Sequence, residues 1–66
     1  MNVMKLKGKI REKGLTQAAL AREINIDKST LQRKFKKAES FTIGEVERIT
    51  YILNLSDSEA MQIFLH

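Results

Sequence analysis

One local pattern occurs four times in this chain of 66 residues and restricts what the chain can fold into. Each time, an apolar residue precedes a residue that can cap a helix, and a second apolar residue follows four positions after the cap. Such a set predicts a helix start, because the cap accepts a free backbone N–H and the apolar pair packs across the first turn. The four sets are Leu15, Thr16 and Leu20; Ile26, Asp27 and Leu31; Phe41, Thr42 and Val46; and Leu55, Ser56 and Ala60.

Two glutamates strengthen this prediction. Glu45 and Glu59 lie three residues after Thr42 and Ser56, which is the spacing of a capping box. An apolar stripe near the N-terminus predicts a fifth helix that ends at Gly14, since glycine readily adopts the left-handed conformation after a helix. The stripe consists of Val3, Leu6 and Ile10.

These signals predict an all-α fold, a compact bundle of five short helices that includes a helix-turn-helix. There is no proline and no alternating apolar pattern of a β-strand. We expect one domain over residues 1–66, with helices at residues 3–13, 17–24, 28–37, 43–53 and 57–65. The expected core residues are Leu6, Ile10, Leu15, Leu20, Ala21, Ile24, Leu31, Phe35, Val46, Ile49, Leu53 and Phe64.

The composition argues against catalysis and against a membrane span. The chain has no cysteine, its only histidine is His66, and no glycine-rich phosphate loop is present. We therefore expect no enzyme, no metal, no cofactor and no small-molecule substrate. No apolar run approaches the roughly 18 residues of a transmembrane helix, so we expect a cytoplasmic protein, in a bacterial or phage-infected cell, that does not bind membranes.

The basic residues are concentrated in one part of the chain. Residues 1–37 contain eleven Lys and Arg against three acids, a net charge of +8, whereas residues 38–66 contain one Arg against five acids, a net charge of −4. Such a one-sided distribution is typical of a protein that binds a phosphate backbone.

The second and third predicted helices are separated by only three residues, "NID". Two helices joined so closely cross at a steep angle, and the alanines of "TQAALAREI" allow that close crossing. Asn25 lies where the turn needs a left-handed residue, and asparagine adopts this conformation more readily than most residues. The pair therefore predicts a helix-turn-helix.

The outward face of residues 28–37 carries donors suited to DNA. At 100° per residue, Leu31 and Phe35 lie about 40° apart and define the buried side, and Arg33 lies opposite them. Ser, Thr, Gln, Lys and Arg fill the rest of the face, and no glutamate occurs between Lys28 and Lys37. Such a face suits base edges and phosphates in a major groove.

The run "QAALAREINIDKSTLQRKF" resembles the helix-turn-helix of small phage repressors and Cro-like regulators, the lambda-repressor-like or XRE-type family. Gln17 occupies the first motif position and Ala21 the fifth. The segment "FTIGEVERITYILNLSDSEAMQIFL" is similar to the two C-terminal helices of short phage and prophage members. The chain departs from the family at Asn25, where a turn glycine is usual, and at Lys34, where an apolar residue is common.

The resemblance implies a small phage or prophage transcriptional regulator that binds a double-stranded DNA operator. In the family, the start of the third helix reads bases and the start of the second contacts phosphate. Arg33 is the strongest base reader, because a guanidinium can bind guanine O6 and N7 together. The implied base readers are Lys28, Ser29, Gln32 and Arg33, and the implied phosphate-binding residues are Gln17, which would also brace the third helix, Lys34, Lys36 and Lys37.

Two alternatives stay open. The same face could bind a partner repressor protein instead of DNA, which would make the chain a modulator or anti-repressor. The apolar C-terminal segment "EAMQIFLH" either closes the core through Phe64 or also contacts a second copy of the chain, in solution or only on DNA. The candidate dimer contacts are Met61, Ile63 and Leu65.

Overall fold

The computed structural model describes residues 1–65, so that His66 lies outside the described residues. Its helices are α1 (Val3–Glu12), α2 (Gln17–Glu23), α3 (Lys28–Lys36), α4 (Ile43–Ile52) and α5 (Asp57–Phe64). Each helix begins at the predicted residue and ends one residue earlier than predicted. A 3-10 turn, η1 (Ala38–Ser40), was not predicted. The all-α fold with five α-helices is confirmed.

The helix starts form as the local pattern predicts, with one exception. Thr16 accepts a hydrogen bond from the Ala19 backbone N–H at 3.0 Å, and both capping boxes of α4 and α5 are complete. Asp27 holds the extended cap conformation, but its carboxylate makes no capping hydrogen bond. The prediction that this side chain caps α3 is therefore wrong, although its position at the helix start is correct.

Left-handed residues connect the helices at three places. Gly14 and Asn25 have φ values of +75° and +64°, as their positions predict. Asn54, between α4 and α5, is a third such residue with φ +50°. Glycine and asparagine tolerate this conformation better than other residues do, so these turns depend on their residue types.

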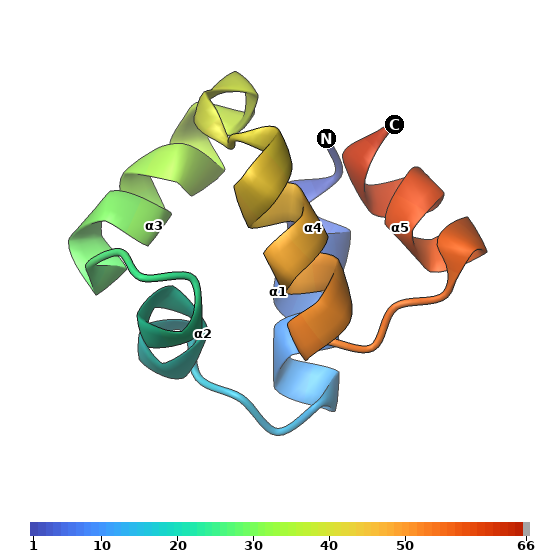
Figure 1. Ribbon diagram of the computed structural model, residues 1–66, viewed down its shortest axis with the longest axis horizontal. Helices are drawn as coiled ribbons and strands as arrows, with labels where there is room; N and C mark the ends of the chain where they lie inside the picture. Colours follow the sequence, from blue (N-terminus) through green and yellow to red (C-terminus); the bar gives the residue numbers. More distant parts are fainter. Residues whose placement is uncertain (66) are drawn as a thin grey trace.

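The helices are arranged around α1 and α4. Figure 1 shows these two helices in the centre, with α2 and α3 on one side and α5 on the other. The start of α1 lies close to the end of α5, where the Asn2 backbone N–H donates to the Ile63 carbonyl oxygen at 2.6 Å. Because α1 and α4 lie between them, α5 and α3 are at opposite sides of the molecule (Figure 1).

The core contains most of the predicted residues, with corrections at five positions. Leu15, Val46 and Phe64 are only half-buried, whereas Leu55 and Ile63 are buried. At the C-terminal end the error has a local cause, because Ile63, Phe64 and Leu65 are consecutive large apolar residues and the helical period alone does not decide which one faces inward. The buried apolar residues are Leu6, Ile10, Leu20, Ala21, Ile24, Leu31, Phe35, Ile49, Leu53, Leu55 and Ile63.

Candidate nucleic-acid interface

Helices α2 and α3 form the predicted helix-turn-helix. The two helices contact each other directly, and Figure 1 shows α2 nearly end-on while α3 runs across the view, so that their axes cross steeply. Backbone hydrogen bonds close the turn, from Asn25 N–H to the Arg22 oxygen at 3.1 Å and from Ile26 N–H to the Ala21 oxygen at 2.9 Å. The local backbone therefore holds α3 in place against α2.

The outward face of α3 is polar and basic. Leu31 and Phe35 are buried on the opposite side, 0% and 8% exposed. At about 1.5 Å per residue, this nine-residue helix is about 14 Å long. A major groove about 12 Å wide admits an α-helix, whose diameter with side chains is about 10 to 12 Å. All four predicted base readers and two of the predicted phosphate ligands are exposed on this helix or, for Lys37, at its C-cap. They are Lys28, Ser29, Gln32, Arg33, Lys36 and Lys37.

The guanidinium of Arg33 is held by a neighbour on the same helix. Its Nη2 donates a hydrogen bond to the Thr30 hydroxyl at 3.0 Å. Within residues 1–65, no carboxylate lies within ion-pair distance of Arg33. The side chain is thus restrained while its charge stays available, and Thr30 is a contributor that the sequence analysis did not assign. The contact could have been predicted from the sequence, because Thr30 and Arg33 are three residues apart and therefore lie on one face of the helix.

Lys34 differs from the other lysines of α3 because it faces the rest of the protein. Its Nζ lies 3.1 Å from the Glu45 carboxylate and donates to the Ser40 carbonyl oxygen at 2.8 Å. The ammonium also lies 5.8 Å from the centre of the Phe41 ring, and the side chain is 15% exposed. The predicted phosphate ligand is therefore bound internally. This pairing also explains how a lysine occupies a position that is often apolar in similar chains.

Glu45 links α4 to α3. Burial raises the pKa of this carboxyl, but the hydrogen bond from the Thr42 backbone N–H and the contact with Lys34 outweigh burial, so the net pKa is lowered. Glu45 thus remains a carboxylate that both caps α4 and neutralises Lys34. The sequence predicted that Glu45 caps α4, but it did not predict the contact between Glu45 and Lys34.

Gln17 is the first residue of α2 and lies beside α3. It is half-buried and lines a small hollow together with Gln32 and Lys36. Within the described residues, its amide makes no hydrogen bond to α3, so the expected bracing of the third helix is not present as a direct bond. Gln17 therefore lies next to exposed α3 side chains, and its contact with phosphate stays a prediction.

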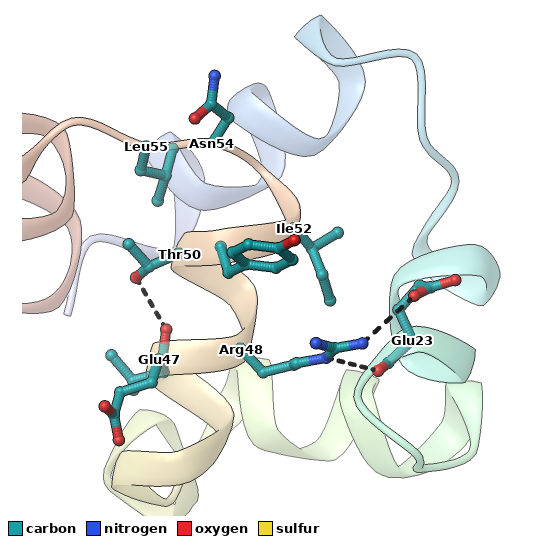
Figure 2. Close-up of a pocket in the computed structure, with 9 residues that line it drawn as sticks. Glu23, Glu47, Arg48, Thr50, Ile52, Asn54 and Leu55 are labelled. Atoms are coloured by element: carbon teal, nitrogen blue, oxygen red, sulfur yellow. Dashed lines mark hydrogen bonds and ion pairs between the residues drawn. The ribbon is translucent and has the colours of Figure 1, made fainter.

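A second hollow, between α2 and α4, has a different charge. Figure 2 shows Arg48 reaching from α4 to Glu23 at the end of α2, with Nη2 3.9 Å from the carboxylate and Nε donating to the Glu23 carbonyl oxygen at 3.4 Å. Glu47 also lines this hollow. Because the lining carries two carboxylates and a single arginine that already pairs with Glu23, this hollow is a poor site for a polyanion.

The C-terminal helix exposes two of the three candidate dimer contacts. Met61 and Leu65 are 57% and 78% exposed and line an apolar hollow with Val46 and Phe64. Ile63 is fully buried, so its assignment as a dimer contact is wrong. It lies one turn after Glu59, which pairs with Lys9 of α1, and the side of α5 that carries both residues faces the protein.

Other kinds of site are not evident in residues 1–65. No cluster of three or more His, Asp or Glu side chains there could hold a metal ion. In the same residues, no helix has the length and apolar character needed to cross a membrane.

Comparison with known proteins identifies one family. The model of the Cro/C1-type HTH DNA-binding domain matches residues 5–63, which include all five α-helices except the first two residues of α1 and the last of α5. A search of the curated proteins and a search of the solved structures each found no match.

Proposed function

Because the chain belongs to the Cro/C1-type helix-turn-helix DNA-binding family, we propose that it is a small phage or prophage transcriptional regulator, similar to Cro and repressors, that binds a specific duplex operator through α3. One observation carries this proposal. The exposed face of α3 presents Arg33 with its charge free and its position restrained by Thr30, on a helix without acidic residues.

The proposed contacts follow from this face. Arg33, Lys28, Ser29 and Gln32 read base edges in the major groove, where hydrogen-bonding groups distinguish the four base pairs. Lys36, Lys37 and Gln17 bind the flanking phosphates and set the register of α3 on the duplex. Lys34 is not among these ligands, since a phosphate contact would require it to leave Glu45.

We further propose that two copies bind a pseudo-palindromic operator. One short helix reads few base pairs, and dimeric helix-turn-helix proteins extend their specificity by binding two half-sites about one helical turn apart. Met61 and Leu65 are the proposed contacts between the copies. Met61 lies on α5 and Leu65 is its C-cap, and α5 lies at the side of the molecule opposite α3, so that dimer contact and DNA contact do not compete for the same surface (Figure 1).

The test is a selection of bound duplexes from a random pool with the wild-type protein, Arg33→Ala and Arg11→Ala. Arg11→Ala is the matched control, because Arg11 is exposed on α1 and its substitution removes one guanidinium outside α3. We expect a palindromic consensus for the wild type and for Arg11→Ala. With Arg33→Ala, preference should disappear at one guanine per half-site, a loss of about 1 to 3 kcal/mol in discrimination.

Two results would contradict the proposal in different ways. An unenriched pool with the wild type would remove the DNA-binding function and favour the alternative of binding to a partner repressor. An unchanged consensus with Arg33→Ala would keep DNA binding but remove Arg33 as a base reader.

A further inference from the structure

A polar hollow of about 430 Å³ lies where α1, α2 and α3 meet. Building on the proposed function, we infer that it seats a phosphate of the DNA backbone and that Lys7 of α1 is a ligand of this phosphate. Lys7 is not among the DNA-binding residues predicted from the sequence. The hollow is lined by Lys7, Gln17, Gln32, Phe35 and Lys36.

The lysines of α1 point in two directions. Lys5 donates a hydrogen bond to Gln62, and Lys9 contacts both Glu12 and Glu59, so these two lysines bind side chains within α1 and on α5. Lys7 instead reaches toward α3, where its Nζ lies 5.2 Å from the centre of the Phe35 ring. One lysine of the first helix thus joins the side of the protein that carries the proposed DNA-reading face.

The surroundings of Lys7 leave its charge available. An aromatic face attracts an ammonium through the ring quadrupole but carries no net charge that would neutralise it. Within residues 1–65, no carboxylate lies within ion-pair distance of Lys7, in contrast to Lys9 and Lys34. Phe35 is a buried residue of the core, so the ring is a fixed support for the ammonium.

The other lining groups complete a site of the right chemistry. Lys36 provides a second ammonium and the amide of Gln17 provides N–H donors, next to the proposed base reader Gln32, while no acidic residue lines the hollow. Ammonium and amide donors are the groups that proteins use for phosphate oxygens. Gln32 and Lys36 belong to α3, so a phosphate seated here would flank the base-reading face.

The experiment measures DNA affinity as a function of salt for the wild type, Lys7→Gln and Lys7→Arg. Loss of one phosphate contact should lower the slope of log K against log salt by about 0.9 and the affinity by roughly tenfold at 0.1 M salt, equally for specific and random duplexes. Lys7→Arg should retain the slope. Lys13→Gln, an exposed lysine at the end of α1, removes the same charge and should leave the slope nearly unchanged.

A second measurement identifies the phosphate itself. Uncharged methylphosphonate groups are placed one at a time in the operator, and we expect one position per half-site at which the substitution weakens the wild type but not Lys7→Gln. Circular dichroism shows whether each variant is folded. Lys7→Met, which keeps an unbranched apolar stem on Phe35, replaces Lys7→Gln if glutamine unfolds the protein.

The outcomes separate this inference from the proposed function. Wild-type binding with an unchanged slope for Lys7→Gln, and no phosphate position coupled to Lys7, would overturn the inference and leave operator binding intact. Absence of duplex binding by the wild type would overturn the proposed function and, with it, the phosphate site.

Discussion

At the scale of single residues, the lysines of α3 have the same charge but different surroundings. Lys36 and Lys37 are exposed, whereas Lys34 is enclosed by Glu45, Ser40 and Phe41. A half-buried ammonium is stable only with such partners, because the desolvation of an unpaired charge is costly. Lys34 therefore stabilises the protein, and its neighbours on α3 remain available to DNA.

This difference predicts that two alanine substitutions change the stability by different amounts. Lys34→Ala should lower the free energy of unfolding by about 1 to 2 kcal/mol, between the values for exposed and buried ion pairs, because it leaves Glu45 without its partner. Lys36→Ala should change it by less than about 0.5 kcal/mol. Urea unfolding followed by circular dichroism measures both.

DNA binding provides the complementary measurement. Lys36→Ala should lower the salt dependence of operator binding, whereas Lys34→Ala should leave it unchanged under conditions where the variant is folded. A lower salt slope for Lys34→Ala, together with unchanged stability, would restore Lys34 as a phosphate ligand and contradict the role we assign to it.

At the scale of elements, α5 combines a local and a distant contact at one residue. Glu59 accepts the Ser56 backbone N–H at 2.9 Å within the capping box and also pairs with Lys9 of α1. The contact with Lys9 is the main cause that lowers the pKa of Glu59, to about 2, and the same pair raises the pKa of Lys9. Glu59 thus connects the start of α5 to the first helix.

The lowered pKa predicts a loss of stability in acid. Since the pKa of Glu59 is about 2 in the folded protein and near 4.5 in the unfolded chain, the unfolded chain binds more protons between these values. The contribution of Glu59 to stability is therefore complete above pH 4.5 and declines as the pH falls toward 2. Urea unfolding at pH 7, 4.5, 3 and 2 measures it.

Two variants test whether Glu59 is responsible for the loss of stability in acid. Glu59→Gln should be less stable than the wild type at pH 7, and its stability should fall less steeply between pH 4.5 and 2. Asp57→Asn removes one negative charge from the same turn without a contact to Lys9 and serves as the control. An equally steep decline for Glu59→Gln would assign the acid sensitivity to other carboxylates.

At the scale of the whole molecule, packing divides the charges. The acids of the C-terminal half include Glu45 and Glu59, which bind Lys34 and Lys9 from the basic half. Within the described residues, Lys28, Arg33, Lys36 and Lys37, on α3 and at its C-cap, form no ion pair. Met61 and Leu65 are exposed on α5 and directly after it, and α5 lies at the other side of the protein (Figure 1). The fold thereby separates a proposed DNA surface from a proposed dimer surface.

This separation predicts that dimerisation can be removed without loss of the fold. The double variant Met61→Gln and Leu65→Gln changes exposed side chains, so its stability should stay within about 0.5 kcal/mol of the wild type. Its affinity for a single half-site should be unchanged. Its affinity for the full palindrome should fall roughly tenfold, as expected for a coupling free energy of about 1 to 3 kcal/mol.

Gel-shift titrations on half-site and full-site duplexes measure these affinities. Tyr51→Gln is the control, because Tyr51 is also exposed but lies on α4 and lines a different hollow. Equal palindrome affinities for the double variant and the wild type would show that α5 does not join two copies on DNA.

Much of the fold could be predicted because its determinants are local. Caps such as Thr42 and Ser56 act on residues three positions away, and Gly14 and Asn25 determine turns through their own backbone conformations. The exposed face of α3 follows from helical periodicity once Leu31 and Phe35 are placed inward. Here the sequence was sufficient by itself, since each contact joins residues within one or two turns.

The charged and apolar partners were decided by tertiary structure. Whether Lys34 meets phosphate or Glu45, and whether Lys7 turns toward α3 or α5, depends on how helices distant in sequence pack together. The same holds for Ile63, which is buried where Phe64 was expected. Helix starts were therefore determined by the sequence through short-range hydrogen bonds, whereas the assignment of each lysine required the packed fold, because ion-pair and cation–π contacts form only where separate helices approach within a few ångströms.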